Sequence, residues 1–342
     1  MRPLCRRAAE GDNVKRRIAQ ALFRVGAVFP AQALAAIVPQ SRVVVLNLHR
    51  VNPYRDMFAE AMHPNVFDAL VGLLTARFEI TTFRALSAEA AAPRRARVVL
   101  SFDDGYHDFV EYVLPILERH GVRCNLNLIA GSIATGQPPF VGRLSAVLRD
   151  LSCQQLAEIR VPGFGRNFAP GDDKTIFRNR LSNYLKSRSV ESRRDILADS
   201  SRWFASAIDT IDVHPQDRMM TAAEVQACAR HELGNHSYSH ESMAFQSEDF
   251  FLADLERAED LFAKSRVSPT AYAFPNGSYT NRQISVLARR GVHDVLLVRQ
   301  GHEPVDCPAG TTVWTRYGFQ AASVEEAKLK VMAAAFQTGK AI

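Results

Sequence analysis

Two adjacent carboxylates, Asp103 and Asp104, end the hydrophobic stretch VVLSFDDG at residues 98–105. Like charges held this close need a compensating cation, a shared proton or water. A second stretch, GNHSYSH, places His236 and His240 four residues apart. Imidazoles at that spacing share one face of a helix or tight turn, which suits two ligands of a single metal ion. Each pair alone is a weak signal, because acidic turns and surface histidines are common.

Taken together, the two stretches predict a metal-dependent hydrolytic site. Each lies where a predicted strand gives way to a loop, and barrel enzymes place their chemistry at such positions. One carboxylate and two imidazoles form an incomplete ligand set that leaves room for water. One aspartate would therefore bind a divalent metal with the two histidines. The other would accept a proton from the activated water.

The residues around these stretches predict alternating strands and helices. The apolar, β-branched run at 42–51 is typical of a buried strand, and apolar residues recur at helical spacing within 65–77. Further strands are expected at 78–83, 96–102, 122–131, 232–236, 270–277 and 293–298, and further helices at 112–121, 220–231, 241–265 and 281–291. This alternation favours a parallel sheet with crossover helices.

The alternation breaks between about 137 and 217. Charged helical stretches flank a loop rich in Gly and Pro in this part of the sequence. We expect a helical insertion that covers one face of the main fold and is not a separate catalytic unit.

Most of the net charge of +6 lies at the N-terminus. The first 24 residues hold seven Lys and Arg residues against two acidic ones, so the body of the protein is nearly neutral. A nucleic-acid surface on the folded body is therefore not expected. Residues 1–41 are predicted to form a basic helical arm, with residues 1–38 making a peripheral contact with an anionic membrane or packing on the body.

The N-terminal segment is a poor membrane span and a poor signal peptide. Its uncharged part, residues 25–41, is short and contains Pro30 and Pro39, while Arg24 interrupts the apolar region. The five cysteines are scattered without a CxxC pair, which favours a reducing compartment. We expect a cytoplasmic protein, peripheral at the inner membrane if the arm binds lipid, in preference to an exported one.

The stretches SFDDG, HSYSH and FPNGSY resemble successive motifs of the polysaccharide deacetylases, carbohydrate esterase family 4 with its NodB-homology domain. The likeness runs over residues 42–319. It implies an α/β fold, a distorted, incomplete (β/α) barrel of about seven strands, TIM-like in architecture. It also implies metal-dependent removal of N-acetyl groups from amino-sugar polymers. We place the deacetylase domain at 42–330, the helical insertion at about 137–217 within it, and a C-terminal tail at 331–342.

The resemblance also assigns roles to the paired residues. By position, Asp103 matches the general base of the family. Its metal ligands match Asp104, His236 and His240. This ligand set implies one divalent metal and suits Zn²⁺, although Co²⁺, Ni²⁺ or Fe²⁺ would fit too.

Two further catalytic candidates lie where the sequence departs from the family pattern. Asn276 replaces an aromatic residue whose backbone amide serves the oxyanion in the family, and a backbone donor survives a change of side chain. The arginine that many members carry two residues before Pro275 is absent, since that position is Ala273. Arg316 could orient Asp103 instead, or form a structural salt bridge.

The general acid is the largest departure, because the late Leu-x-His motif of many members is missing. The early stretch LNLHRV resembles a subgroup of bacterial exopolysaccharide deacetylases whose acid is a histidine in such a strand. His49 is therefore the candidate acid, with a hydrogen-bonded structural histidine as the alternative and His302 as a second candidate. Asn125 and Asn127 fall on one face of a predicted strand, where they could line the barrel interior, bind sugar hydroxyls or contact buried water.

We therefore expect a metal-dependent hydrolase that removes N-acetyl groups from N-acetylhexosamine residues of a bacterial polysaccharide or its lipid-linked precursor. Its partner is an N-acetylated glycan substrate, and the sequence says nothing of its oligomeric state. Two alternatives remain open. One is an amide hydrolase of the same fold acting on a small molecule or a formyl sugar. The other is an inactive glycan-binding protein, which the presence of all four acidic and histidine site residues disfavours.

Overall fold

The structure is a computed structural model that describes most of the chain. The described residues are 40–54, 56–58, 61–88, 95–169, 171–298, 305 and 308–340. The predicted N-terminal arm and its membrane contact lie outside them, apart from residues 40–41. Among the described helices, none is both long and apolar enough to cross a membrane.

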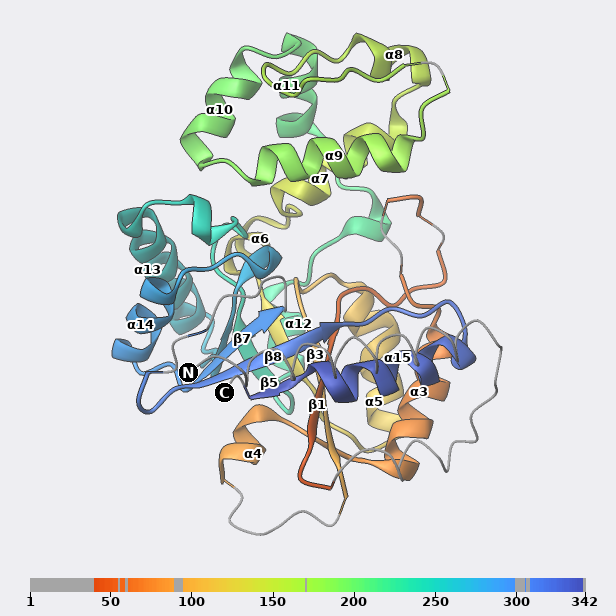
Figure 1. Cartoon of the computed structure of the whole chain (residues 1–342), viewed down its shortest axis with the longest axis vertical. Coiled ribbons are helices and arrows are strands. Elements are labelled where there is room, and N and C mark those ends of the chain that lie inside the picture. The colour runs from red at the N-terminus through yellow and green to blue at the C-terminus, as the bar shows by residue number, and fades with distance from the viewer. Residues whose placement is uncertain are drawn as a thin grey trace, which may run out of the picture.

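Seven parallel strands form a closed barrel at the centre of the lower part of the molecule, with helices around it (Figure 1). In order around the barrel they are β1 (Val43–Leu48), β3 (Arg97–Phe102), β4 (Asn125–Leu128), β5 (Glu232–Asn235), β6 (Ala271–Ala273), β7 (Asp294–Val298) and β8 (Thr312–Gly318). The last strand pairs with the first through Leu46–Tyr317 and Asn47–Gly318. The expected TIM-like (β/α) barrel of about seven strands is confirmed.

Two short strands extend the sheet outside the barrel. β2 (Glu79–Thr81) pairs in parallel with β3, and β9 (Gly339–Lys340) pairs antiparallel with β8. The helices packed around the barrel are α3 (Pro64–Arg77), α4 (Phe83–Ala88), the π-helix η1 (Phe109–Val113), α5 (Leu114–Arg119), α6 (Ala130–Thr135), α12 (Ala222–Ala227), α13 (Glu248–Lys264), α14 (Asn281–Arg289) and α15 (Val324–Gln337). Short 3-10 turns, η3 (Met243–Phe245) and η4 (Pro275–Gly277), follow β5 and β6.

The strands alternate between a helix-facing side and an inner side, as the period of a β-strand requires. Along β3, Val98, Leu100 and Phe102 join the core beneath the helices, whereas Val99 packs inside the barrel with Trp314. Farther along the same inner side the residues become polar. The interior of the barrel therefore has an apolar half at the amino ends of the strands and a polar half at their carboxyl ends. The candidate site lies in the polar half.

Two segments near the site and the C-terminus differ from the expected elements. The helix expected over 241–265 begins only at Glu248, because the Ser247 hydroxyl accepts a hydrogen bond from the backbone of Phe250 and caps it. The preceding residues form the turns around η3. Near the C-terminus, β8 and α15 were not expected as elements. α15 crosses residue 330 because Val331 and Ala334 are buried against the barrel.

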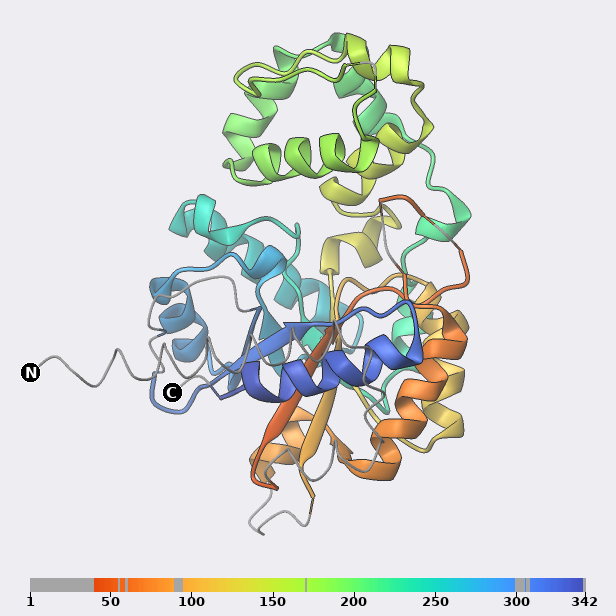
Figure 2. The same ribbon diagram turned by 45° about the vertical axis from the view of Figure 1, so that its right-hand side comes forward.

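Five helices between residues 140 and 210 form a separate layer, which we call the helical layer, above the barrel (Figures 1 and 2). They are α7 (Phe140–Asp150), α8 (Cys153–Glu158), α9 (Lys174–Lys186), α10 (Val190–Ala198) and α11 (Arg202–Thr210), followed by the 3-10 turn η2 (Pro215–Asp217). The layer has its own apolar core, to which the barrel side contributes Phe58. In both views α7 and α9 are the helices of the layer nearest the barrel.

Candidate active site

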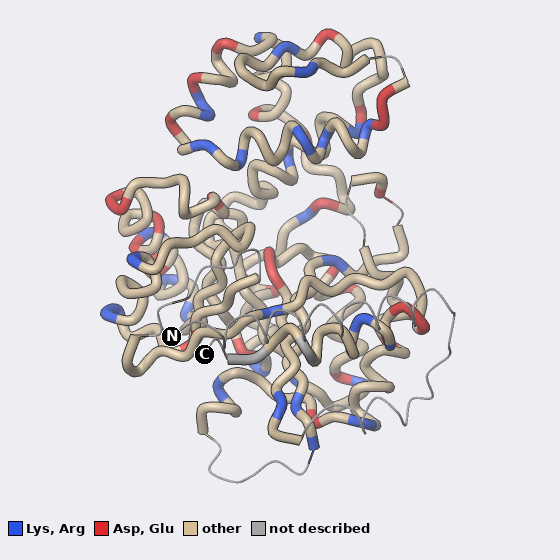
Figure 3. Tube along the Cα trace, viewed as in Figure 1, with Lys and Arg blue, Asp and Glu red and all other residues tan. Residues whose placement is uncertain are grey.

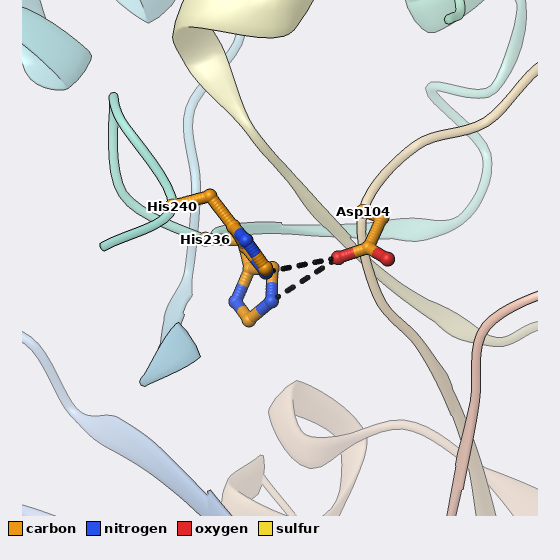
Figure 4. A group of neighbouring side chains, drawn as sticks. All are labelled: Asp104, His236 and His240. Carbon is orange, nitrogen blue, oxygen red and sulfur yellow. Dashed lines mark ion pairs between the residues drawn. The ribbon is translucent and has the colours of Figure 1, made fainter. Parts of the chain in front are cut away.

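Three side chains at the carboxyl ends of β3 and β5 converge on one point (Figure 4). Asp104 Oδ1 lies 3.2 Å from His240 Nε2 and 3.5 Å from His236 Nε2. One ligand atom from each of the three residues lies within 4.8 Å of the others. The structure thus brings together the three residues expected to bind a metal.

The donor set fits a divalent cation. Asp104 Oδ1 is buried and makes no hydrogen bond of acceptable geometry, although it faces two imidazole nitrogens. Burial alone would raise the pKa of Asp104, but His236 and His240 outweigh it and hold that pKa well below its ordinary value. An ionised, unsatisfied oxygen beside two imidazoles is an arrangement that a bound cation would complete.

The turn that carries both histidines is held by hydrogen bonds from outside it. His236 Nδ1 lies 2.8 Å from the carbonyl oxygen of Ala273, so its Nε2 is directed toward Asp104. Asp254 on α13 accepts hydrogen bonds from the backbone N–H groups of Tyr238 and Ser239, at 2.8 and 3.0 Å. This positioning role of Asp254 could not be seen in the sequence, because the residue looks like any acid on an amphipathic helix.

The backbone is unusually shaped at the site. Five described residues other than glycine have positive φ, and three of them are Asp104 (78°), His240 (58°) and Asn276 (56°). A left-handed conformation is costly for most side chains and concentrates at functional positions. Asparagine is among the residues that adopt this conformation most readily, which suits it to position 276.

Asp103, the candidate base, is fixed by Arg316. The guanidinium donates two hydrogen bonds to the carboxylate, from Nη1 to Oδ1 at 2.7 Å and from Nη2 to Oδ2 at 2.9 Å. The two side chains are 0% and 2% exposed. Burial would raise the pKa of Asp103, yet the charge of Arg316, with a smaller effect of His236, lowers it to about 2. Arg316 therefore contacts Asp103 directly, as both predicted roles of this arginine require, orientation of the base and a structural salt bridge.

A second donor to Asp103 comes from β4. Asn127 Nδ2 lies 2.7 Å from Asp103 Oδ1 and 3.2 Å from the hydroxyl of Ser101. Gly234 on the neighbouring strand makes room for it, since a Cβ there would lie 2.0 Å from Asn127 Oδ1. The sequence left three interpretations of Asn127 open, and the structure shows that its side chain lines the barrel interior. Its contact with the base was not predicted, because only the strand order brings β3 and β4 together.

The two remaining candidates lie at the rim of the site. His49 follows β1 directly. Alternate residues of β1, Val45 and Asn47, face the barrel interior, and His49 is the next residue in this alternation. It is exposed, makes no hydrogen bond to a described residue, and its charge lowers the pKa of Asp103. The backbone N–H of Asn276 likewise has no partner among the described residues. His302 lies outside the described residues.

The profile of the polysaccharide deacetylase family matches residues 209–295, the segment that holds His236, His240 and Asn276. Together with the ligand group at the carboxyl-terminal edge of the barrel, this match indicates a deacetylase-type hydrolase. The resemblance to polysaccharide deacetylases that the motifs predicted is thereby confirmed. No curated protein matches the chain.

Two solved structures share the fold. The deacetylase PplD of Streptococcus pyogenes, solved in complex with acetate, is 13% identical, with a TM-score of 0.55 over 86% of this chain and 99% of that one. IcaB from Ammonifex degensii is 15% identical, with a TM-score of 0.51 over 86% of this chain and 97% of that one. At such low identity these likenesses show the fold.

Proposed function

We propose that the protein hydrolyses the N-acetyl group of N-acetylhexosamine residues in a bacterial polysaccharide or its lipid-linked precursor, with one divalent metal held by Asp104, His236 and His240. The observation that carries the proposal is the pairing of this ligand set with an ionised carboxylate. Asp103 Oδ2 lies 3.9 Å from His236 Nε2, so a base held by Arg316 stands directly beside the three converging ligands.

The residues of the site would divide the chemistry among them. A divalent metal, when bound, would lower the pKa of a water ligand and polarise the carbonyl group of the substrate. Asp103 would accept the proton of the attacking water at Oδ2, which receives one hydrogen bond where Oδ1 receives two. The free N–H of Asn276 would donate to the carbonyl oxygen as negative charge develops there. His49 would donate a proton to the leaving amine.

The expected metal is zinc, which two imidazoles and a carboxylate suit. Cobalt, nickel and iron would also accept these ligands, and metal-replacement experiments distinguish them. We further propose a cytoplasmic location, with residues 1–38 making a salt-sensitive contact with anionic lipid. Vesicle co-sedimentation of the full chain and of a chain lacking residues 1–38 tests the contact. Equal binding of the two proteins would refute it.

The central experiment joins metal content to released acid. We expect the purified, metal-loaded protein to release acetate from oligomers of N-acetylglucosamine, with one equivalent of metal per chain. His236→Ala should lose most of the metal and the activity while keeping its circular dichroism spectrum, because the ligand lies at the loop end of β5. A full equivalent of metal in this variant would contradict the ligand assignment.

The same assay separates the alternative functions. Release of formate from formylated sugars, with none from acetylated ones, would favour the formyl-sugar alternative. Glycan binding without release of either acid, in protein that holds its metal, would favour an inactive binding protein.

A further inference from the structure

The two histidines of the proposed ligand set are held in different ways. His236 Nδ1 lies 2.8 Å from the carbonyl oxygen of Ala273, and this contact orients the imidazole ring. The Nδ1 atom of His240 is buried and has no hydrogen-bond partner among the described residues. Metal-binding histidines usually make such a second contact, which orients the ring and supports metal binding. The position of the His240 ring therefore depends on its backbone.

The backbone of His240 has a conformation that needs support. Its φ angle of 58° is left-handed, which is costly for a residue with a Cβ and persists only where the surrounding structure enforces it. On the amino-terminal side the support is local, because the N–H of His240 donates to the Ser237 hydroxyl at 2.8 Å. On the carboxyl-terminal side the next residue is Glu241, which is buried. Contacts of Glu241 therefore act directly on the ligand residue before it.

An arginine of the helical layer holds Glu241. Arg193 on α10 donates from Nη1 and Nη2 to the two carboxylate oxygens of Glu241, at 2.6 and 2.5 Å. Each of the two side chains is 8% exposed. The guanidinium also lies 4.2 Å from the centre of the Phe140 ring on α7. A double hydrogen bond between two planar groups fixes their orientation as well as their distance, so Glu241 is held firmly.

Arg193 pairs across to the ligand turn and not within its own helix. Figure 3 shows that α10 carries residues of both charges, in agreement with its sequence. The acids Glu191 and Asp195 are exposed, and so is the neighbouring Arg194. Arg193 is the one residue of α10 that is buried. Because a buried charge is costly without its partner, this pairing keeps α10 against the ligand turn.

A second contact joins the start of α10 to the same segment. The backbone N–H of Val190 donates to Gln246 Oε1 at 3.0 Å, and Gln246 Nε2 donates to the carbonyl oxygen of Arg188 at 3.1 Å. Gln246 directly follows η3, the turn that comes after Glu241. The helical layer therefore contacts the chain on the carboxyl-terminal side of His240 at two places.

We propose that Arg193 is a positioning residue of the metal site, which holds Glu241 and through it keeps the His240 imidazole directed at Asp104. The inference rests on the proposed function, because it takes Asp104, His236 and His240 as the metal ligands. It adds that the helical layer, which supplies none of these ligands, controls how tightly the metal is bound. The support acts on His240, since His236 already has its contact with Ala273.

Zinc affinity, measured by competition with a chromogenic chelator, tests this role without any substrate. Arg193→Met should weaken zinc binding by about tenfold or more, the usual effect of losing a group that supports a metal ligand. Arg193→Lys keeps the charge but not the double hydrogen bond, so its zinc affinity should lie between those of Arg193→Met and the wild type. The visible absorption spectrum of bound cobalt, which reports the ligand geometry, should change in Arg193→Met.

A double variant separates positioning from a general loss of stability. Arg193→Met alone leaves Glu241 buried without its countercharge. Arg193→Met combined with Glu241→Met replaces the ion pair by apolar side chains, which should restore much of the stability. Zinc binding should remain weak in the double variant, because no hydrogen bond then holds residue 241. Wild-type zinc affinity in the double variant, or in Arg193→Lys and Arg193→Met alike, would overturn the inference.

Two matched variants control for the layer as a whole. Arg194→Met removes an exposed charge from the same helix. Arg149→Met breaks another contact between the layer and the barrel, the ion pair of Arg149 with Asp56 at 2.6 Å. Both should bind zinc as the wild type does. An equal loss of zinc affinity in Arg149→Met and Arg193→Met would overturn a specific role for Arg193.

Failure of the proposed ligand set would look different. In that case the wild type would bind no zinc, or His236→Ala would keep a full equivalent, and the inference would fall with the ligand assignment. If His236→Ala loses zinc while Arg193→Met keeps wild-type affinity, the proposed function stands and the role of Arg193 alone is wrong.

Discussion

The polar half of the barrel interior and helix α9 of the helical layer each hold a fully or partly buried arginine, but they treat the charge in different ways. Arg316 is fully buried and meets both carboxylate oxygens of Asp103, with Asn47 and Ser101 accepting further hydrogen bonds. Arg178 on α9 is partly buried and donates hydrogen bonds to the neutral oxygens of Ser145 and Asn179. In the interior two opposite charges are paired directly, whereas this arginine of the layer has neutral hydrogen-bond partners.

This difference should show in stability and turnover. A buried ion pair costs free energy to break and keeps the candidate base in one place. An arginine that donates to neutral oxygens leaves no buried carboxylate without a partner when it is changed. Variants of the interior should therefore affect turnover and stability more than variants of α9.

The largest expected effect is the loss of turnover when Asp103, in the barrel interior, is changed. Asp103→Asn should lower kcat by about a thousandfold, because an amide cannot accept a proton. The metal content should stay at one equivalent, since Asp104, His236 and His240 remain. Elemental analysis and released acetate measure the two quantities on one sample. Activity near that of the wild type would place the base elsewhere.

Breaking the ion pair from the other side should show its effect on stability. Arg316→Met leaves the Asp103 carboxylate buried without its countercharge, so the free energy of unfolding should fall by about 3–5 kcal/mol. Urea titration followed by circular dichroism measures the loss. The matched variant Arg180→Met, at an exposed position on α9, should change it by less than about 0.5 kcal/mol. Similar losses in both variants would remove the contrast between the two regions.

A substitution at His49, at the rim of the barrel interior, should lower turnover without lowering the free energy of unfolding. His49→Ala should lower turnover of an amide substrate by about a hundredfold with the metal retained, because the leaving amine must be protonated. The loss should be smaller for an acetate ester, whose leaving group needs less help. Equal losses on both substrates would indicate a structural role for His49, and no loss on either would direct attention to His302.

The smallest expected effect is the stability change in the helical layer. Lys186→Gln should not lower the free energy of unfolding by more than about 0.5 kcal/mol, because no carboxylate loses a partner and a partly buried charge is removed. The same urea titration measures it, beside Arg316→Met. A loss comparable to that of Arg316→Met would mean that Lys186 is part of the scaffold, and the comparison between the two regions would fail.

The sequence predicted the barrel and the placement of the metal-ligand candidates, for a local physical reason. Strands ending in polar residues bring those residues to one edge of a parallel sheet, and the motifs DDG and HSYSH mark two such ends. Arg316 could be suspected because the family arginine is missing at Ala273. Its contact with Asp103 is now visible in the structure.

What the sequence could not predict depends on contacts between distant elements. Asp254 looks like an ordinary surface acid until α13 is packed against the histidine turn. Asn127 contacts Asp103 only because β4 pairs with β3. The start of α13 at Glu248 was missed because apolar residues just before it imitate helical spacing.

The pairing of β1 with β8 has a consequence for how the protein is made. Asp103 and its partner Arg316 are 213 positions apart. At a synthesis rate of about 5–20 residues per second, on the order of 10–40 s separates the appearance of the two side chains on the ribosome. Until β8 emerges, the nascent barrel has two open strand edges and an unpaired acid at its centre. Because contacts so distant in sequence also form slowly, the ion pair between Asp103 and Arg316 should be among the last interactions to appear. An intact Asp103–Arg316 pair would then mark a chain that has finished folding.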